Sequence, residues 1–141
     1  MSKKKIFVSF DYEKDRRYKF LLEAWNKNSE FEFEFDDKST REINSWNIPT
    51  IKAGLSRKIN EADYTLVIIG EDANKLHKDR SLIGYRNWQN YEIAKSKELG
   101  KKLIAVKLNF NNESPDELIG VGASWAYSFT EDAIMKAVRR V

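Results

Sequence analysis

The stretch YTLVIIG, residues 64–70, decides the fold because it is apolar almost without interruption. A strand with one face in water alternates apolar and polar residues, whereas a strand covered on both faces is apolar along its whole length. Residues 64–70 therefore predict a central parallel strand with helices on both sides. The run KLIAVKL at residues 102–108 has the same character and predicts a second buried strand.

The segments around this strand alternate between strand and helix patterns. The sequence KIFVSF at residues 5–10 predicts the first strand, and the alternating EFEFEF at residues 30–35 predicts an edge strand with a charged outer face. A weaker strand is expected at residues 125–129. Amphipathic helices are expected at residues 15–28, 50–63, 88–99 and 130–141. This alternation predicts an α/β, flavodoxin-like three-layer fold with a five-stranded parallel sheet in the order 2-1-3-4-5.

The length and amino-acid composition of the chain exclude several classes of function. The 141 residues are expected to form a single domain, residues 1–141. The 25 basic and 22 acidic residues are spread along the chain, so nucleic acid is not an expected partner. With no cysteine and only His77, neither a metal site, a disulfide nor a Ser/His/Asp triad is expected. The absence of cysteine favours a cytoplasmic protein, and the apolar runs, far shorter than the roughly 20 residues of a membrane span, favour a soluble one.

One acid stands out in NWQNYEIAKSKELG, residues 87–100. On a helical wheel Glu92 shares a stripe with Trp88, Tyr91, Lys95 and Leu99. A carboxylate among aromatic rings is costly to bury, so it is paired, displaced to the helix edge or placed at the mouth of a cleft. A surface ion pair with Lys95 is the simplest alternative, and Trp88 and Tyr91 are equally compatible with ordinary core packing.

The predicted fold places the other candidate site residues at the same edge of the sheet, beyond the carboxyl ends of the strands. Ligands of parallel α/β sheets bind beyond the carboxyl ends of the strands, at the point where the strand order reverses. The loop after the first strand carries Phe10, Asp11 and Tyr12, and the loop after the second begins with Asp36 and Asp37. That second loop, residues 36–49, also contains Trp46, which either meets a ligand or partner or folds back onto the core. No P-loop or dinucleotide-binding glycine motif is present.

Three segments resemble a known family. They are KKIFVSFDYEKD at residues 4–15, YTLVIIG at 64–70 and NWQNYEIAKSKELGKKLIAVKL at 87–108. Together they resemble the TIR-like domains of bacterial defence, most closely the TIR subunit of the Thoeris anti-phage system, over residues 4–108. The sharpest motif is W-x-x-Y-E-I, Trp88–Ile93, followed by a Gly-Lys-Lys turn into an apolar strand.

The resemblance implies a function. It implies an NAD+ glycohydrolase or cyclase that cleaves the bond between nicotinamide and ribose, with NAD+ as substrate and no other cofactor. The product would be a linear or cyclic ADP-ribose signal that reaches a downstream effector, and the domain would act in a homo-oligomer or TIR–TIR assembly. The implied catalytic residue is Glu92. The implied substrate-binding residues are Trp88 and Tyr91 in the wall of the site, Phe10, Asp11 and Tyr12 near the nicotinamide, and Asp36, Asp37 and Trp46 in the BB-loop region.

Two other functions remain open from the sequence. One is a TIR-like interaction module without catalysis, which would assemble through residues 36–49. The other is a nucleoside deoxyribosyltransferase-like enzyme, which shares the fold and also uses a glutamate near a ribose. Retention of Glu92 in the motif favours the NAD+-cleaving enzyme over the interaction module.

Overall fold

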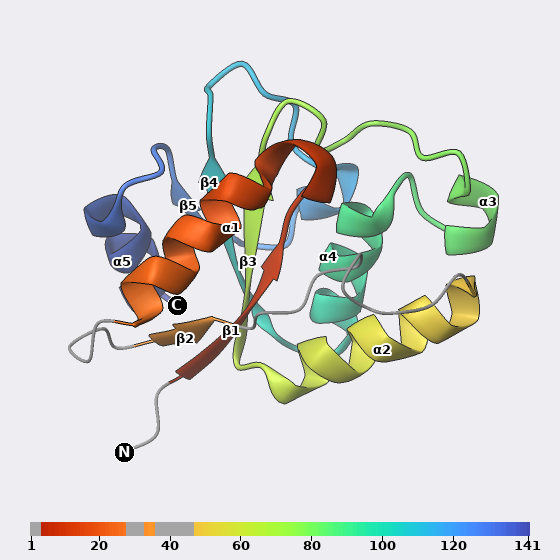
Figure 1. Ribbon diagram of the computed structural model, residues 1–141, viewed down its shortest axis with the longest axis horizontal. Coiled ribbons are helices and arrows are strands. Elements are labelled where there is room, and N and C mark those ends of the chain that lie inside the picture. Colours follow the sequence, from red (N-terminus) through yellow and green to blue (C-terminus); the bar gives the residue numbers. More distant parts are fainter. Residues whose placement is uncertain (1–3, 28–32, 36–46) are drawn as a thin grey trace.

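The computed structural model describes residues 4–27, 33–35 and 47–141 (Figure 1). A five-stranded parallel sheet lies at its centre, with the strand order β2-β1-β3-β4-β5. The strands are β1 Lys4–Ser9, β2 Phe33–Phe35, β3 Tyr64–Ile69, β4 Lys102–Lys107 and β5 Ser124–Ala126. The flavodoxin-like order predicted from the sequence is confirmed, with β3 in the middle and β2 at an edge.

Helices cover both faces of the sheet (Figure 1). The helices are α1 Tyr12–Asn26, α2 Ile48–Glu61, α3 Arg80–Ile83, α4 Trp88–Glu98 and α5 Glu131–Arg139, with a 3-10 turn η2 at Asp116–Leu118. Helices α1 and α5 pack on one face, and α2 and α4 pack on the other. No helix in the described ranges is both long and apolar enough to cross a membrane.

The central strand explains the three layers. Leu66 and Ile68 of β3 belong to the apolar cluster under α1 and α5, whereas Val67 and Ile69 belong to the cluster that includes Ile93 of α4. The side chains of these four β3 residues are fully buried. Burying one such side chain contributes about 1.5–3 kcal/mol, so an uninterrupted apolar strand strongly favours having helices on both faces.

Helix caps move two element boundaries away from those predicted. Helix α1 begins at Tyr12 rather than residue 15, because the Asp11 carboxylate accepts the Glu13 backbone N–H at 3.0 Å. Tyr12 is therefore helical and not part of a loop. Helix α2 begins inside the segment predicted as loop 36–49, because the Asn47 side chain accepts the Thr50 N–H at 3.1 Å. The last strand, β5, also ends earlier than expected.

Helix α4 ends at Glu98, one residue before the predicted end at residue 99. Gly100 has φ of 73°, a left-handed conformation that glycine adopts without a side-chain clash. The Gly100 N–H donates to Lys97 O at 3.1 Å and the Lys101 N–H donates to Ser96 O at 2.9 Å. These two bonds close the helix and lead the chain directly into β4, which fixes α4 against the sheet.

Candidate active site

Glu92 lies in the second turn of α4, beside the end of β1. Its side chain is only 3% exposed, and its Oε1 accepts a hydrogen bond from the Ser9 hydroxyl at 2.6 Å. Ser9 is the last residue of β1 and is fully buried. The acid singled out in the sequence therefore lies at the carboxyl edge of the sheet, where ligands bind in this fold. Lys95, the partner named in the alternative interpretation, forms an ion pair with Glu98 at 2.8 Å.

Gln89 joins the ends of two strands one turn before Glu92. Its Nε2 donates to Ile68 O at 3.0 Å and to Ser9 O at 3.4 Å, and the side chain is buried. Strands β1 and β3 pair as far as Ser9 and Val67, and the strand order reverses between them. Gln89 thus links the first turn of α4 to the ends of β1 and β3, where the strand order reverses. Nothing in the sequence pattern distinguished this glutamine from a solvated one.

Three buried asparagines hold the start of α4 to neighbouring loops. Asn87 Oδ1 accepts the Asn90 backbone N–H at 2.9 Å and caps the helix. Asn87 Nδ2 donates to Ala73 O and Lys75 O, both at 2.9 Å, and Asn90 Nδ2 donates to Asn74 Oδ1 at 3.1 Å. Buried amides with several partners are costly to disrupt, so they fix the helix position. No pattern in the sequence predicted this network.

Tyr91 and Trp88 face α2 rather than the Ser9 side of α4. The Tyr91 side chain is 5% exposed, and its hydroxyl contacts Ser56 Oγ at 2.9 Å and donates to Lys52 O at 3.2 Å. Trp88 packs edge-on against Tyr91 with ring centroids 5.7 Å apart. Tyr91 thus lies within the apolar cluster between α4, α2 and β1. This position agrees with the alternative prediction that Tyr91 is an ordinary core residue. Its predicted role in a substrate wall stays a prediction.

Phe10, Asp11 and Tyr12 follow Ser9 directly and are half-buried. The Phe10 and Tyr12 rings lie with centroids 6.3 Å apart. Asp11 caps α1, and its carboxyl has a pKa raised above the ordinary value, first by burial and then by the charge of Asp72. These residues adjoin the Ser9 partner of Glu92 in the chain, and their predicted contact with nicotinamide stays a prediction.

A buried acid that the sequence analysis missed lies on α1. Asp15 is 5% exposed, and among the described residues its Oδ2 has no hydrogen-bond partner. The carboxyl rests on Gly70 at the end of β3, where a Cβ would lie 2.0 Å from Oδ2. Burial, followed by the charge of Asp11, raises the pKa of Asp15 to about 6. The only local signal for this contact was a glycine at the end of the central strand.

Two further acids after β3 form ion pairs with one lysine on α1. Lys14 Nζ lies 2.6 Å from Glu71 and 3.3 Å from Asp72. Within the ranges that the structure describes, no three His, Cys, Asp or Glu side chains are arranged to hold a metal ion. The predicted site residues Asp36, Asp37 and Trp46 lie outside the described residues.

Most of the chain matches a known protein family. A family described as Thoeris protein ThsB, TIR-like domain, matches residues 7–113, which is more than half of the chain and includes Ser9, Gln89 and Glu92. The chain belongs to this family. The family resemblance seen in the sequence is therefore confirmed for this ThsB-type TIR-like domain. A comparison with curated proteins found no match.

Two solved deoxyribosyltransferase structures share the fold of this TIR-like domain. A 2-deoxyribosyltransferase from Bacillus psychrosaccharolyticus has a TM-score of 0.58 at 16% identity, covering 92% of this chain and 90% of that one. The 2-desoxiribosyltransferase from Leishmania mexicana has a TM-score of 0.58 at 11% identity, covering 98% and 99%. The TIR domains of the activated Roq1 resistosome match at a TM-score of 0.43 and 18% identity, covering 74% and 57%.

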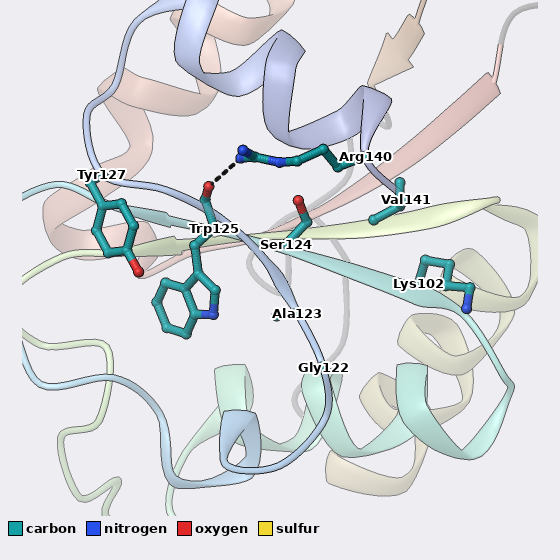
Figure 2. Close-up of a pocket in the computed structure, with 8 residues that line it drawn as sticks. All are labelled: Lys102, Gly122, Ala123, Ser124, Trp125, Tyr127, Arg140 and Val141. Atoms are coloured by element: carbon teal, nitrogen blue, oxygen red, sulfur yellow. Dashed lines mark hydrogen bonds between the residues drawn. The ribbon is translucent and has the colours of Figure 1, made fainter.

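A separate cavity of about 540 Å³ lies at the edge strand β5 of the TIR-like domain (Figure 2). Arg140 crosses it and donates from Nη2 to Trp125 O at 2.8 Å, and the Trp125 and Tyr127 rings stack with centroids 6.0 Å apart. Of the predicted site residues that the structure describes, none lines it. The cavity is lined by Lys102, Gly122, Ala123, Ser124, Trp125, Tyr127, Arg140 and Val141.

Proposed function

We propose that this TIR-like domain cleaves the bond between nicotinamide and ribose in NAD+, with Glu92 as the catalytic residue. The observation that carries the proposal is the Ser9–Glu92 hydrogen bond of 2.6 Å at the carboxyl end of β1. Family membership adds support, since the match includes both residues. The position of Glu92 also supports the proposal, because it is a buried acid beside the end of β1, and ligands of parallel α/β sheets bind where the strand order reverses.

The chemistry needs only one well-placed carboxylate. The bond between C1′ of the ribose and N1 of nicotinamide breaks, and its electron pair leaves with N1, so that the cationic ring departs as neutral nicotinamide. Positive charge then develops at C1′, as in glycoside hydrolysis, and a fixed anion stabilises it. Water attacking C1′ and losing a proton gives ADP-ribose, whereas attack by a nitrogen of the adenine gives a cyclic product. In this proposal Glu92 stabilises the developing cation or binds the ribose hydroxyls.

The test compares wild type with Glu92→Gln, which keeps the shape of the side chain and removes its charge. Each protein is incubated with NAD+ at several protein concentrations, and the products are identified by mass spectrometry. The matched control is Glu98→Gln, which alters an exposed acid on the same helix. We expect nicotinamide and an ADP-ribose species from wild type and the control, and at least about 100-fold less from Glu92→Gln.

The same experiment separates the other functions. Adding extract from phage-infected cells supplies a trigger, and the range of concentrations tests whether activity needs a homo-oligomer. A transferase would exchange the base of a deoxyribonucleoside and leave NAD+ intact. Absence of turnover on either substrate, with all proteins equally folded, would reject the enzyme and favour the interaction module. An ADP-ribose product would leave a downstream effector as the next partner to identify.

A further inference from the structure

Ser9 is the residue around which the candidate site is built. Its hydroxyl donates to Glu92 Oε1 at 2.6 Å, and its carbonyl accepts from Gln89 Nε2 at 3.4 Å. A hydroxyl–carboxylate bond of this length falls in the range of charge-assisted hydrogen bonds, which are about twice as strong as neutral ones. One strand residue thus contacts two successive turns of α4, through its side chain and its backbone.

The sheet determines where this hydroxyl lies. Ser9 pairs with Val67 in the parallel ladder between β1 and β3, and its side chain is fully buried. Serine has a single side-chain torsion that positions its oxygen, so a fixed backbone leaves few positions for the hydroxyl. Glutamate has three torsions and would otherwise lose considerable freedom only on binding a ligand. Because the sheet fixes the Ser9 hydroxyl, the hydrogen bond from Ser9 restricts the orientation of the Glu92 carboxylate.

Burial and hydrogen bonding act in opposite directions on Glu92. Its exposed fraction of 3% disfavours the charged form, whereas a donor to the carboxylate favours it. A cation-stabilising role requires the charged form. The Ser9 hydroxyl is a donor that cannot itself lose its proton in the working pH range, so it supports the anion without adding charge.

We infer that Ser9 is a positioning residue, which holds the Glu92 carboxylate in its ionised form and in one orientation at the end of β1. This inference rests on the proposed function, because it assigns Ser9 a part in the same reaction. Ser9 keeps its proton throughout and forms no covalent bond. The residue acts through Glu92, and its contribution is lost when the hydroxyl is removed.

The test uses Ser9→Ala, with Ser9→Thr as the conservative variant that keeps the hydroxyl. The control is Thr65→Val, because Thr65 also forms a buried hydroxyl contact from the sheet to α4, with Ser96 at 2.7 Å, without touching the Glu92 carboxylate. Two quantities are measured on the full chain: kcat and KM with NAD+, and the titration of the Glu92 carboxyl by 13C NMR. Glu92→Gln assigns the resonance, because its signal disappears in that variant.

The surrounding charges do not differ between these proteins, so a changed titration reports on the hydroxyl. The ionisable side chains on the elements packed against α4, and on the loops that leave them, include Asp11 after β1, Lys52 and Lys58 on α2, Asp72 after β3, Lys107 on β4, and Asp116 and Glu117 on η2.

We expect Ser9→Ala to shift the titration of Glu92 to higher pH and to lower kcat by about 10- to 100-fold with KM changed less than about threefold. Ser9→Thr and Thr65→Val should keep the wild-type titration. The inference is overturned if Ser9→Ala leaves the Glu92 titration unchanged, or if Thr65→Val shifts it equally. If Ser9→Ala raises the pKa of Glu92 but the wild-type protein never cleaves NAD+, the proposed function is rejected. The inference that Ser9 keeps the Glu92 carboxylate ionised and oriented would then still be supported.

Discussion

Asp15 should make the protein less stable as the pH rises from about 4 to about 7. Its carboxyl is buried under α1, and burial raises its pKa to about 6 from the ordinary 3.8. Between these two values the folded protein binds more protons at this group than the unfolded chain does. The free energy of unfolding therefore falls with rising pH in this window, and the full cost is present above it.

The size of the effect follows from the two pKa values. Each pH unit between them corresponds to 1.36 kcal/mol, so the ionised carboxyl costs about 3 kcal/mol at pH 8. Asp15→Asn keeps the shape of the side chain and cannot ionise. The variant should gain stability relative to wild type as the pH rises, by up to about 3 kcal/mol between pH 4 and pH 8. Comparing the difference at two pH values removes any constant effect of exchanging acid for amide.

The assay is equilibrium denaturation in urea at a series of pH values from 4 to 8, followed by circular dichroism. Asp132→Asn serves as the control, because Asp132 is an exposed acid in the first turn of α5. Its difference from wild type should change by less than about 0.5 kcal/mol over the same range. A difference between Asp15→Asn and wild type that stays constant with pH, or that shrinks as the pH rises, would refute this explanation.

Three further substitutions test the packing around the site, each by the denaturation midpoint. Gly70→Ala should destabilise the fold by about 1–3 kcal/mol, because the new Cβ would lie 2.0 Å from Asp15 Oδ2, and adding Asp15→Ala should recover most of that loss. Tyr91→Phe should cost about 0.5–1.5 kcal/mol, since it removes hydroxyl contacts to α2, and a cost of zero would show that these contacts contribute nothing. Asn90→Ala should cost about 1–3 kcal/mol because it leaves buried amide and backbone partners unsatisfied, whereas an exposed Asn60→Ala should not.

Much of the fold was predictable because it depends on local periodicity. The apolar run at residues 64–70 and the alternation at Phe33 and Phe35 place a central strand and an edge strand, and both are observed. Boundaries were less predictable, since they depend on single capping side chains. Asp11 looked like a loop residue, yet its hydrogen bond to Glu13 N–H starts α1 at Tyr12.

The acid Glu92 was predictable from the motif, whereas its surroundings were not. The helical wheel grouped it with Tyr91, but the two side chains contact different elements. Helix α4 packs against α2, η2 and the sheet, so its first two turns are buried around most of their circumference. A wheel assumes one buried face and one solvated face, and that assumption fails for a helix covered on several sides.

The partner of Glu92 shows why a motif alone does not define this site. Ser9 and Glu92 lie 83 positions apart in the chain, and the serine ends a strand in which a small polar residue attracts no notice. The contact exists because the strand order 2-1-3-4-5 brings the end of β1 next to β3, where Gln89 fastens α4 to both strands. The motif supplies the acid, and the topology brings a hydrogen-bond donor to it. Substituting the donor therefore tests the site more specifically than substituting the acid, because loss of Glu92 removes any function of that side chain, whereas loss of the Ser9 hydroxyl changes only the state in which Glu92 is held.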